Sequence, residues 1–104
     1  MLKGRAKEEA YVKLVKKIKI RNELGLHARP AALIVKILQP TKSMVNFTYR
    51  NETINARSIM SVLMLAAQRN TLITVTVEGD DAEYTLSLLE KAFENKFGED
   101  CCER

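Results

Sequence analysis

The sequence is poor in histidine, cysteine and glycine. Its single histidine is His27, and its two cysteines, Cys101 and Cys102, are adjacent near the C-terminus. So few ligands cannot build a histidine site or a cysteine quartet for a metal, and adjacent cysteines give no disulfide framework. The four glycines are scattered, which leaves no glycine-rich loop for a nucleotide phosphate. We therefore expect a protein without a bound metal or other cofactor.

Long apolar segments are also missing. The longest apolar stretch runs from Ala31 to Leu38, is interrupted by Lys36, and is too short to span a bilayer. The basic N-terminal residues are not followed by the apolar segment of a secretory signal. Cysteines confined to a polar tail suit a reducing compartment. These absences predict a soluble, cytoplasmic protein with no membrane insertion.

The length of the chain limits how many domains it can form, and its net charge indicates which partners it favours. A chain of 104 residues can form one core but not two. We expect one domain over residues 12–97, preceded by a flexible or helical extension, 1–11, and followed by a polar tail, 98–104. The formal charge is +4, from 17 basic and 13 acidic residues. This balance favours acidic partners without deciding between nucleic acid, anionic lipid and protein.

The spacing of apolar residues changes along the chain between that of strands and that of helices. The period predicts strands over about 12–20, 45–49, 52–55 and 72–77, and helices over about 28–39, from 59 onward and from about 82 to 97. Each helix has an apolar side that must be buried. The order therefore predicts a two-layer α+β domain in which helices cover one face of a four-stranded sheet.

Turn and capping residues mark the ends of several elements. Arg50 and Asn51 suit a tight hairpin turn, because asparagine tolerates the left-handed region. Asp80 or Asp81 is expected to cap the last helix, and Gly98 is expected to end it.

His27 lies in the run GLHARPA, residues 25–31, where a strand-like pattern gives way to a helical one. A histidine at a helix N-cap lies beside backbone N–H groups without intrahelical acceptors, at the positive end of the helix dipole. Phosphate binds well there. Pro30 suits the first turn, and Arg29 adds a charged planar group. The alternative is a surface histidine that merely caps a helix, but the flanking residues favour a nucleophilic imidazole beside an anion-binding site.

Apolar residues are expected on the surface beside this histidine. A helical wheel places part of the first helix's apolar side chains opposite its buried face, next to Arg29. The second helix is apolar nearly all round, so some of its side chains should also be exposed. The residues expected to form a docking surface are Ala32, Leu33, Lys36, Ile59, Met60 and Leu63. The alternative is core packing with a few isolated exposed apolar groups.

Two runs of sequence carry a resemblance to a known family. They are LGLHARPA, which contains His27, and NARSIMSVLML, which contains Ser58 thirty-one residues later. Over about residues 15–97 the chain closely resembles the HPr family, the histidine-containing phosphocarriers of the phosphoenolpyruvate-dependent sugar phosphotransferase system. The resemblance implies an open-faced sandwich of order βαββαβα, with a four-stranded antiparallel sheet covered on one face by three helices.

The resemblance also implies a carrier rather than an enzyme. His27 would accept a phosphoryl group at Nδ1 from phospho-enzyme I, with Arg29 in contact, and pass it to IIA domains in the bacterial cytoplasm. Ser58 would be the regulatory phosphorylation site of a dedicated kinase, although Ser61, Leu63 and Ala66 differ from residues common in the family. We expect a monomer. The residues alone do not distinguish the two ring nitrogens.

Two other functions fit parts of the sequence. One is a mainly regulatory protein-binding module, for carbon or nitrogen signalling, in which Ser58 and the apolar helix matter and His27 is seldom used. The presence of His27 together with Arg29 argues against it. The other is a small nucleic-acid-binding domain, suggested by the positive charge. Strand aromatics are few and no RNP-like motif is present, so no nucleic-acid partner is expected.

Overall fold

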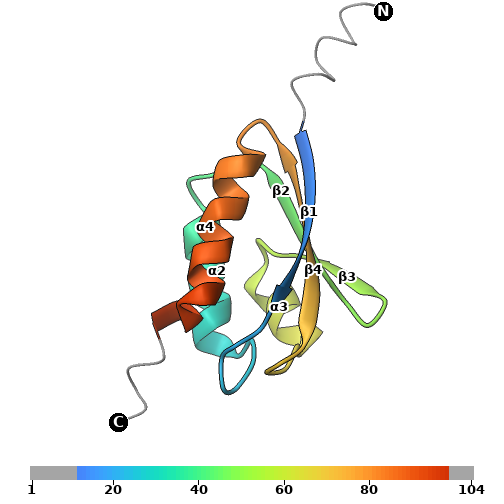
Figure 1. Cartoon of the computed structure of the whole chain (residues 1–104), viewed down its shortest axis with the longest axis vertical. Coiled ribbons are helices and arrows are strands. Elements are labelled where there is room, and N and C mark those ends of the chain that lie inside the picture. The colour runs from blue at the N-terminus through green and yellow to red at the C-terminus, as the bar shows by residue number, and fades with distance from the viewer. Residues whose placement is uncertain (1–11, 99–104) are drawn as a thin grey trace, which may run out of the picture.

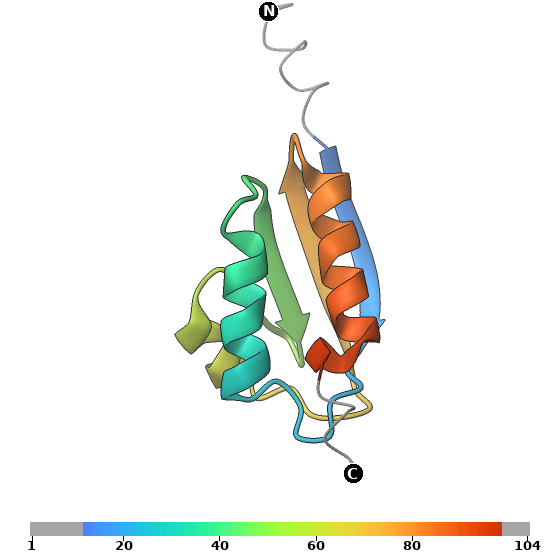
Figure 2. The same cartoon turned by 90° about the vertical axis from the view of Figure 1, so that its left-hand side faces the viewer.

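The computed structural model describes residues 12–98, and the predicted extension over 1–11 and nearly all of the predicted tail lie outside them. The elements within these residues are β1 (Val12–Lys19), α2 (Ala28–Leu38), β2 (Met44–Tyr49), β3 (Glu52–Asn55), α3 (Ile59–Leu65), β4 (Leu72–Gly79) and α4 (Ala82–Glu94). The strands pair antiparallel in the order β1-β4-β2-β3. The three helices lie on one face of this sheet (Figures 1 and 2). The predicted βαββαβα sandwich is confirmed.

Alternation along the central strand β4 separates the two faces of the sheet. Ile73, Val75 and Val77 are buried, whereas the threonines between them are half-buried. The buried side chains meet the inward faces of the helices, where the Phe47 and Phe93 rings pack edge to face with centroids 6.1 Å apart. Burial of these side chains supplies the main stabilisation of the domain.

The β2–β3 hairpin closes as the sequence predicts. Tyr49 pairs with Glu52, and the two residues between them, Arg50 and Asn51, have φ of 53° and 66°. Two consecutive left-handed residues form the turn whose twist matches that of antiparallel strands. This turn holds β3 at the edge of the sheet, immediately before the segment that leads to α3.

The last helix differs from its prediction at both ends. Asp81 is the N-cap residue by position, but its carboxylate does not cap the helix and instead accepts from the backbone N–H of Lys42 and the hydroxyl of Ser43. The helix ends at Glu94 and not at Gly98, because the backbone turns left-handed at Lys96. The predicted core residue Phe97 is still buried, but it lies beyond the helix.

Candidate functional site

His27 lies where the β1–α2 loop enters α2, at the N-cap position. Its backbone is extended (φ −88°, ψ −166°) and its carbonyl accepts the first helical hydrogen bond, from Ala31 N–H at 3.0 Å. The side chain is half-buried and does not cap the helix. The first-turn N–H groups of Ala28 and Arg29 have no intrahelical acceptor, and the first turn holds no acidic residue. The imidazole therefore lies at the positive end of a helix, as predicted.

The loop that carries His27 is held in place by the segment that follows α3. Leu26 is buried, and its N–H donates to the carbonyl oxygen of Ala67 at 3.0 Å. Gly25 has φ of +71°, and a Cβ there would lie 2.4 Å from the same oxygen. No side chain fits at that contact, and a positive φ favours glycine. The position of His27 is thus set by backbone contacts that only glycine at 25 permits.

Arg29 lies in the first turn of α2, and its side chain is exposed. No hydrogen bond or ion pair holds its guanidinium within the part of the chain that the structure describes. An exposed arginine on the first turn can reach an anion bound at the helix N-terminus and bind two of its oxygens.

Ser58 is the N-cap of α3, and its Oγ accepts from the N–H of Ser61 at 3.2 Å. The predicted cap is confirmed. Helices α3 and α2 pack against each other (Figure 2), which places the surfaces that begin at Ser58 and at His27 on the same side of the sheet.

Arg57, immediately before Ser58, has a positioning role that the sequence did not indicate. Its guanidinium donates to the carbonyl oxygens of Leu38 at 2.7 Å, Thr41 at 3.0 Å and Ser43 at 2.7 Å. These carbonyls belong to the end of α2 and the loop after it, so Arg57 joins the C-terminus of α2 to the N-terminus of α3. The unpaired carbonyl oxygens at a helix end predict that a cationic side chain will bind them. They do not predict that this side chain belongs to a residue 19 positions away.

Two leucines of the predicted docking surface are less exposed than expected, while their contact with a partner stays a prediction. Leu33 and Leu63 are half-buried and pack against the core, because each lies at the edge of its helix's buried face. Ala32 and Lys36 are exposed, as predicted. On α3, Ile59 and Met60 are 38% and 62% exposed, and Met64, which the prediction omitted, is 73% exposed. The apolar surface defined by Ile59, Met60 and Met64 is called the α3 patch below.

Two kinds of feature are absent from the part of the chain that the structure describes. Within residues 12–98 no three metal-binding side chains come together. In the same range, no helix has both the length and the apolar composition to cross a membrane. The arrangement therefore offers an imidazole, an arginine and open backbone donors, which together suit a phosphoryl group.

Comparisons with known proteins identify the family. The model of the family described as "PTS HPr component phosphorylation site" matches residues 14–95. The phosphocarrier protein HPr of Chlamydia muridarum is 45% identical over 80 residues, which cover 77% of this chain and 77% of the relative. HPr of Treponema pallidum is 39% identical over 87 residues, 84% of this chain and 99% of the relative. The crystal structure of HPr-C-His from Thermoanaerobacter tengcongensis has a TM-score of 0.80 at 37% identity and covers 84% of this chain and 98% of that chain. The chain belongs to the HPr family of the phosphotransferase system, and it is a carrier of phosphoryl groups rather than a catalyst.

Proposed function

We propose that His27 is the residue that carries the phosphoryl group, from phospho-enzyme I to IIA domains of a sugar phosphotransferase system in the bacterial cytoplasm. The observation that supports this most is the position of the chain's single histidine at the N-terminus of α2, beside the N–H groups of Ala28 and Arg29. Backbone donors and a helix dipole stabilise phosphate oxygens at such a position.

The transfer needs only the imidazole as a nucleophile. The lone pair of a ring nitrogen forms the new N–P bond while the bond from phosphorus to the donor group breaks, and its electron pair stays with the donor. Transfer to a IIA domain repeats the exchange with His27 as the leaving group. Charge in the partner's own site accelerates both steps, so this chain has only to orient the phosphoryl oxygens. On the family resemblance, we propose that the bond forms at Nδ1.

Docking is assigned to the surface around His27. The exposed Ala32 and Lys36 on α2, together with the α3 patch, give apolar contacts with a charged rim, which is the usual composition of a transient interface. The chain is proposed to act as a monomer.

Ser58 is proposed to be a regulatory phosphorylation site for a dedicated kinase and phosphorylase. Its hydroxyl caps α3 directly beside Ile59 and Met60. A phosphate there would add about −1.5 to −2 charge at a helix N-terminus, where the fold tolerates it, and within a surface that partners must approach. Such a charge would change partner choice without unfolding the domain.

The relay is tested with purified enzyme I, labelled phosphoenolpyruvate and a IIA domain. The chain should become labelled, and the label should move to IIA when IIA is added. The phosphoprotein should be acid-labile and base-stable. The His27→Ala variant should fold, because a cap residue contributes only about 0.5–2 kcal/mol, and should accept no label. Labelling without onward transfer would instead favour the mainly regulatory function.

A further inference from the structure

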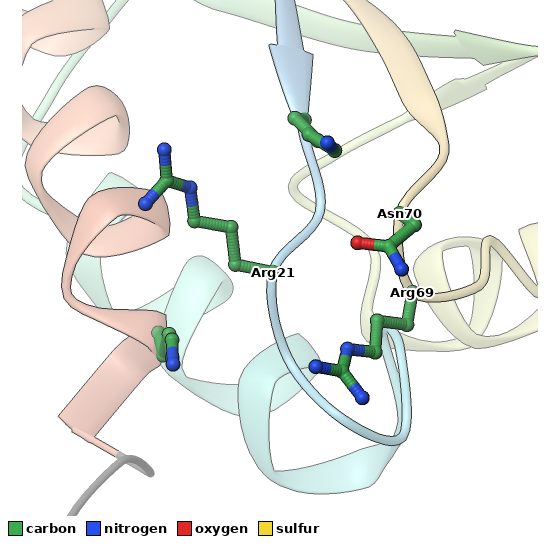
Figure 3. Close-up of a pocket in the computed structure, with 5 residues that line it drawn as sticks. Arg21, Arg69 and Asn70 are labelled. Atoms are coloured by element: carbon green, nitrogen blue, oxygen red, sulfur yellow. The ribbon is translucent and has the colours of Figure 1, made fainter.

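A second basic site lies on the described surface, and neither His27 nor Arg29 lines it. It is a pocket of about 250 Å³ (Figure 3). The lining residues are Lys19, Arg21, Arg69, Asn70 and Lys96. Four of the five are cationic and the fifth has an amide, so the pocket has donors for an anion and no carboxylate to oppose one.

The pocket has a fixed backbone frame made of three segments distant in sequence. Asn70 N–H donates to the carbonyl of Ile20 at 2.7 Å, and Ile20 N–H donates to that of Thr71 at 2.9 Å. The buried Asn22 donates through Nδ2 to the carbonyl of Lys96 at 3.0 Å. These bonds hold the end of β1, the turn before β4 and the turn after α4 together. The cations are therefore gathered by the fold.

Within residues 12–98, none of the four cations of the pocket is joined to a carboxylate by an ion pair. The ion pairs of this range join Lys13 to Glu78 and Lys16 to Glu90, and neither includes a pocket residue. Glu90 and Glu94 line a neighbouring pocket that shares Lys19 and Arg21 with this one, whereas Arg69, Asn70 and Lys96 line only the basic pocket. Like charges gathered in one concave site repel each other and attract an anion that can contact several of them.

The two arginines indicate which anion fits. Figure 3 shows Arg21 and Arg69 extending from adjacent segments with their guanidinium groups well apart. Each planar guanidinium can donate two parallel hydrogen bonds to phosphate, and the lysines add charge. We propose that this pocket binds a compact phosphorylated anion with more than one charged group, at a site separate from that of His27.

The test is a titration of the full-length chain with inorganic pyrophosphate at low ionic strength, followed through backbone amide NMR shifts. Saturable shifts are expected around Arg21, Asn70 and Lys96. The Arg69→Gln variant should bind at least about tenfold more weakly, because it loses a charged pair of hydrogen bonds. Arg50→Gln, the same change at the exposed hairpin turn, should bind like the wild type.

Three results would overturn the proposal. One is the absence of saturable shifts, and another is equal weakening by Arg69→Gln and Arg50→Gln. The third is a response centred on Ala28 and Arg29, which would place the anion at the His27 site instead. In the His27→Ala variant the pocket should bind pyrophosphate unchanged, so failure of the phosphoryl relay and failure of this proposal are distinguishable.

A further experiment tests whether the chain's own acidic residues occupy the pocket. Glu99, Asp100 and Glu103 follow the pocket residue Lys96 in the sequence. If replacing these three by Gln, Asn and Gln tightened pyrophosphate binding more than about tenfold, the C-terminal segment would be the natural occupant, and the proposal of an external ligand would fail. Unchanged affinity would support it.

Discussion

The N–H of Leu26 donates to the carbonyl oxygen of Ala67 at 3.0 Å, and this bond joins the loop before His27 to the segment after α3. The backbones approach so closely here that a Cβ on Gly25 would lie 2.4 Å from the same oxygen. The contact explains how an irregular loop holds the imidazole at the start of α2. It also makes Gly25 a positioning residue for the site.

Gly25→Ala should therefore lower both stability and phosphoryl transfer. The variant combines φ of +71° with a clash against backbone that cannot rotate away, and we expect a loss of about 1–3 kcal/mol in the free energy of unfolding. Gly98→Ala is the matched control, because its φ is +77° but a Cβ there meets nothing within 4 Å. Urea denaturation of both variants separates the clash from the conformational strain. Equal losses would show that the contact with Ala67 is unimportant.

Transfer from enzyme I should be fastest with Arg29, slower in Arg29→Lys and slowest in Arg29→Ala. Lysine keeps the charge but loses the planar group that can bind two phosphate oxygens. Because Arg29 is exposed, neither change should alter thermal unfolding appreciably. Rates of all three proteins are compared at one concentration of phospho-enzyme I. If both variants transferred as fast as the wild type, Arg29 would have no role at the site.

Arg57→Ala should destabilise the domain by roughly 2–3 kcal/mol. The substitution removes the hydrogen bonds that the charged guanidinium donates to the carbonyl oxygens of Leu38 and Ser43. Arg50→Ala, at the exposed turn, should change stability by no more than about 1 kcal/mol, because among the described residues its guanidinium contacts only the Tyr49 ring, at 5.1 Å from the centroid. Chemical denaturation measures both. A loss as small for Arg57 as for Arg50 would mean that water replaces the guanidinium at little cost.

Asp81 should contribute to the acid sensitivity of the fold. Hydrogen bonds from the Ser43 hydroxyl at 2.5 Å and the Lys42 N–H at 2.9 Å lower the pKa of its carboxyl in the folded state. A lowered folded pKa means that the contribution is present above the unfolded value, about 3.9, and is lost as pH falls through the folded pKa. Asp81→Asn should therefore be less stable than the wild type at pH 6, and the difference should shrink towards pH 2. A difference that stays constant with pH would exclude the ionised carboxylate as its source.

Two variants of Ser58 separate its structural and regulatory roles. Ser58→Ala removes the cap and should lower stability by about 0.5–2 kcal/mol while leaving transfer from enzyme I intact. Ser58→Asp keeps a capping oxygen and adds negative charge beside the α3 patch. It should unfold within a few degrees of the wild type but accept phosphate much more slowly, because like charges in an interface are costly. Unchanged transfer by Ser58→Asp at low salt, where screening is weakest, would return Ser58 to a capping role alone.

The order of elements could be predicted because each apolar pattern has one period and clear turn residues, as at Arg50 and Asn51. The position of His27 could be predicted because capping depends on neighbours in sequence. Contacts between distant segments could not, and these include the bonds of Arg57 and those of the Asp81 carboxylate. Which apolar residues of α3 are exposed and which, like the half-buried Leu63, pack against the core could not be predicted, because both flanks of so short a helix look alike in sequence.

The central claim is that His27 alone carries the phosphoryl group, and mapping the modified residue tests it most directly. The chain is incubated with enzyme I and phosphoenolpyruvate, digested under alkaline conditions that preserve phosphohistidine, and analysed by peptide mass spectrometry. The account predicts one phosphoryl group per chain, on the peptide that contains His27, and none in the His27→Ala variant. A phosphoryl group found on any other residue, or retained by His27→Ala, would contradict it.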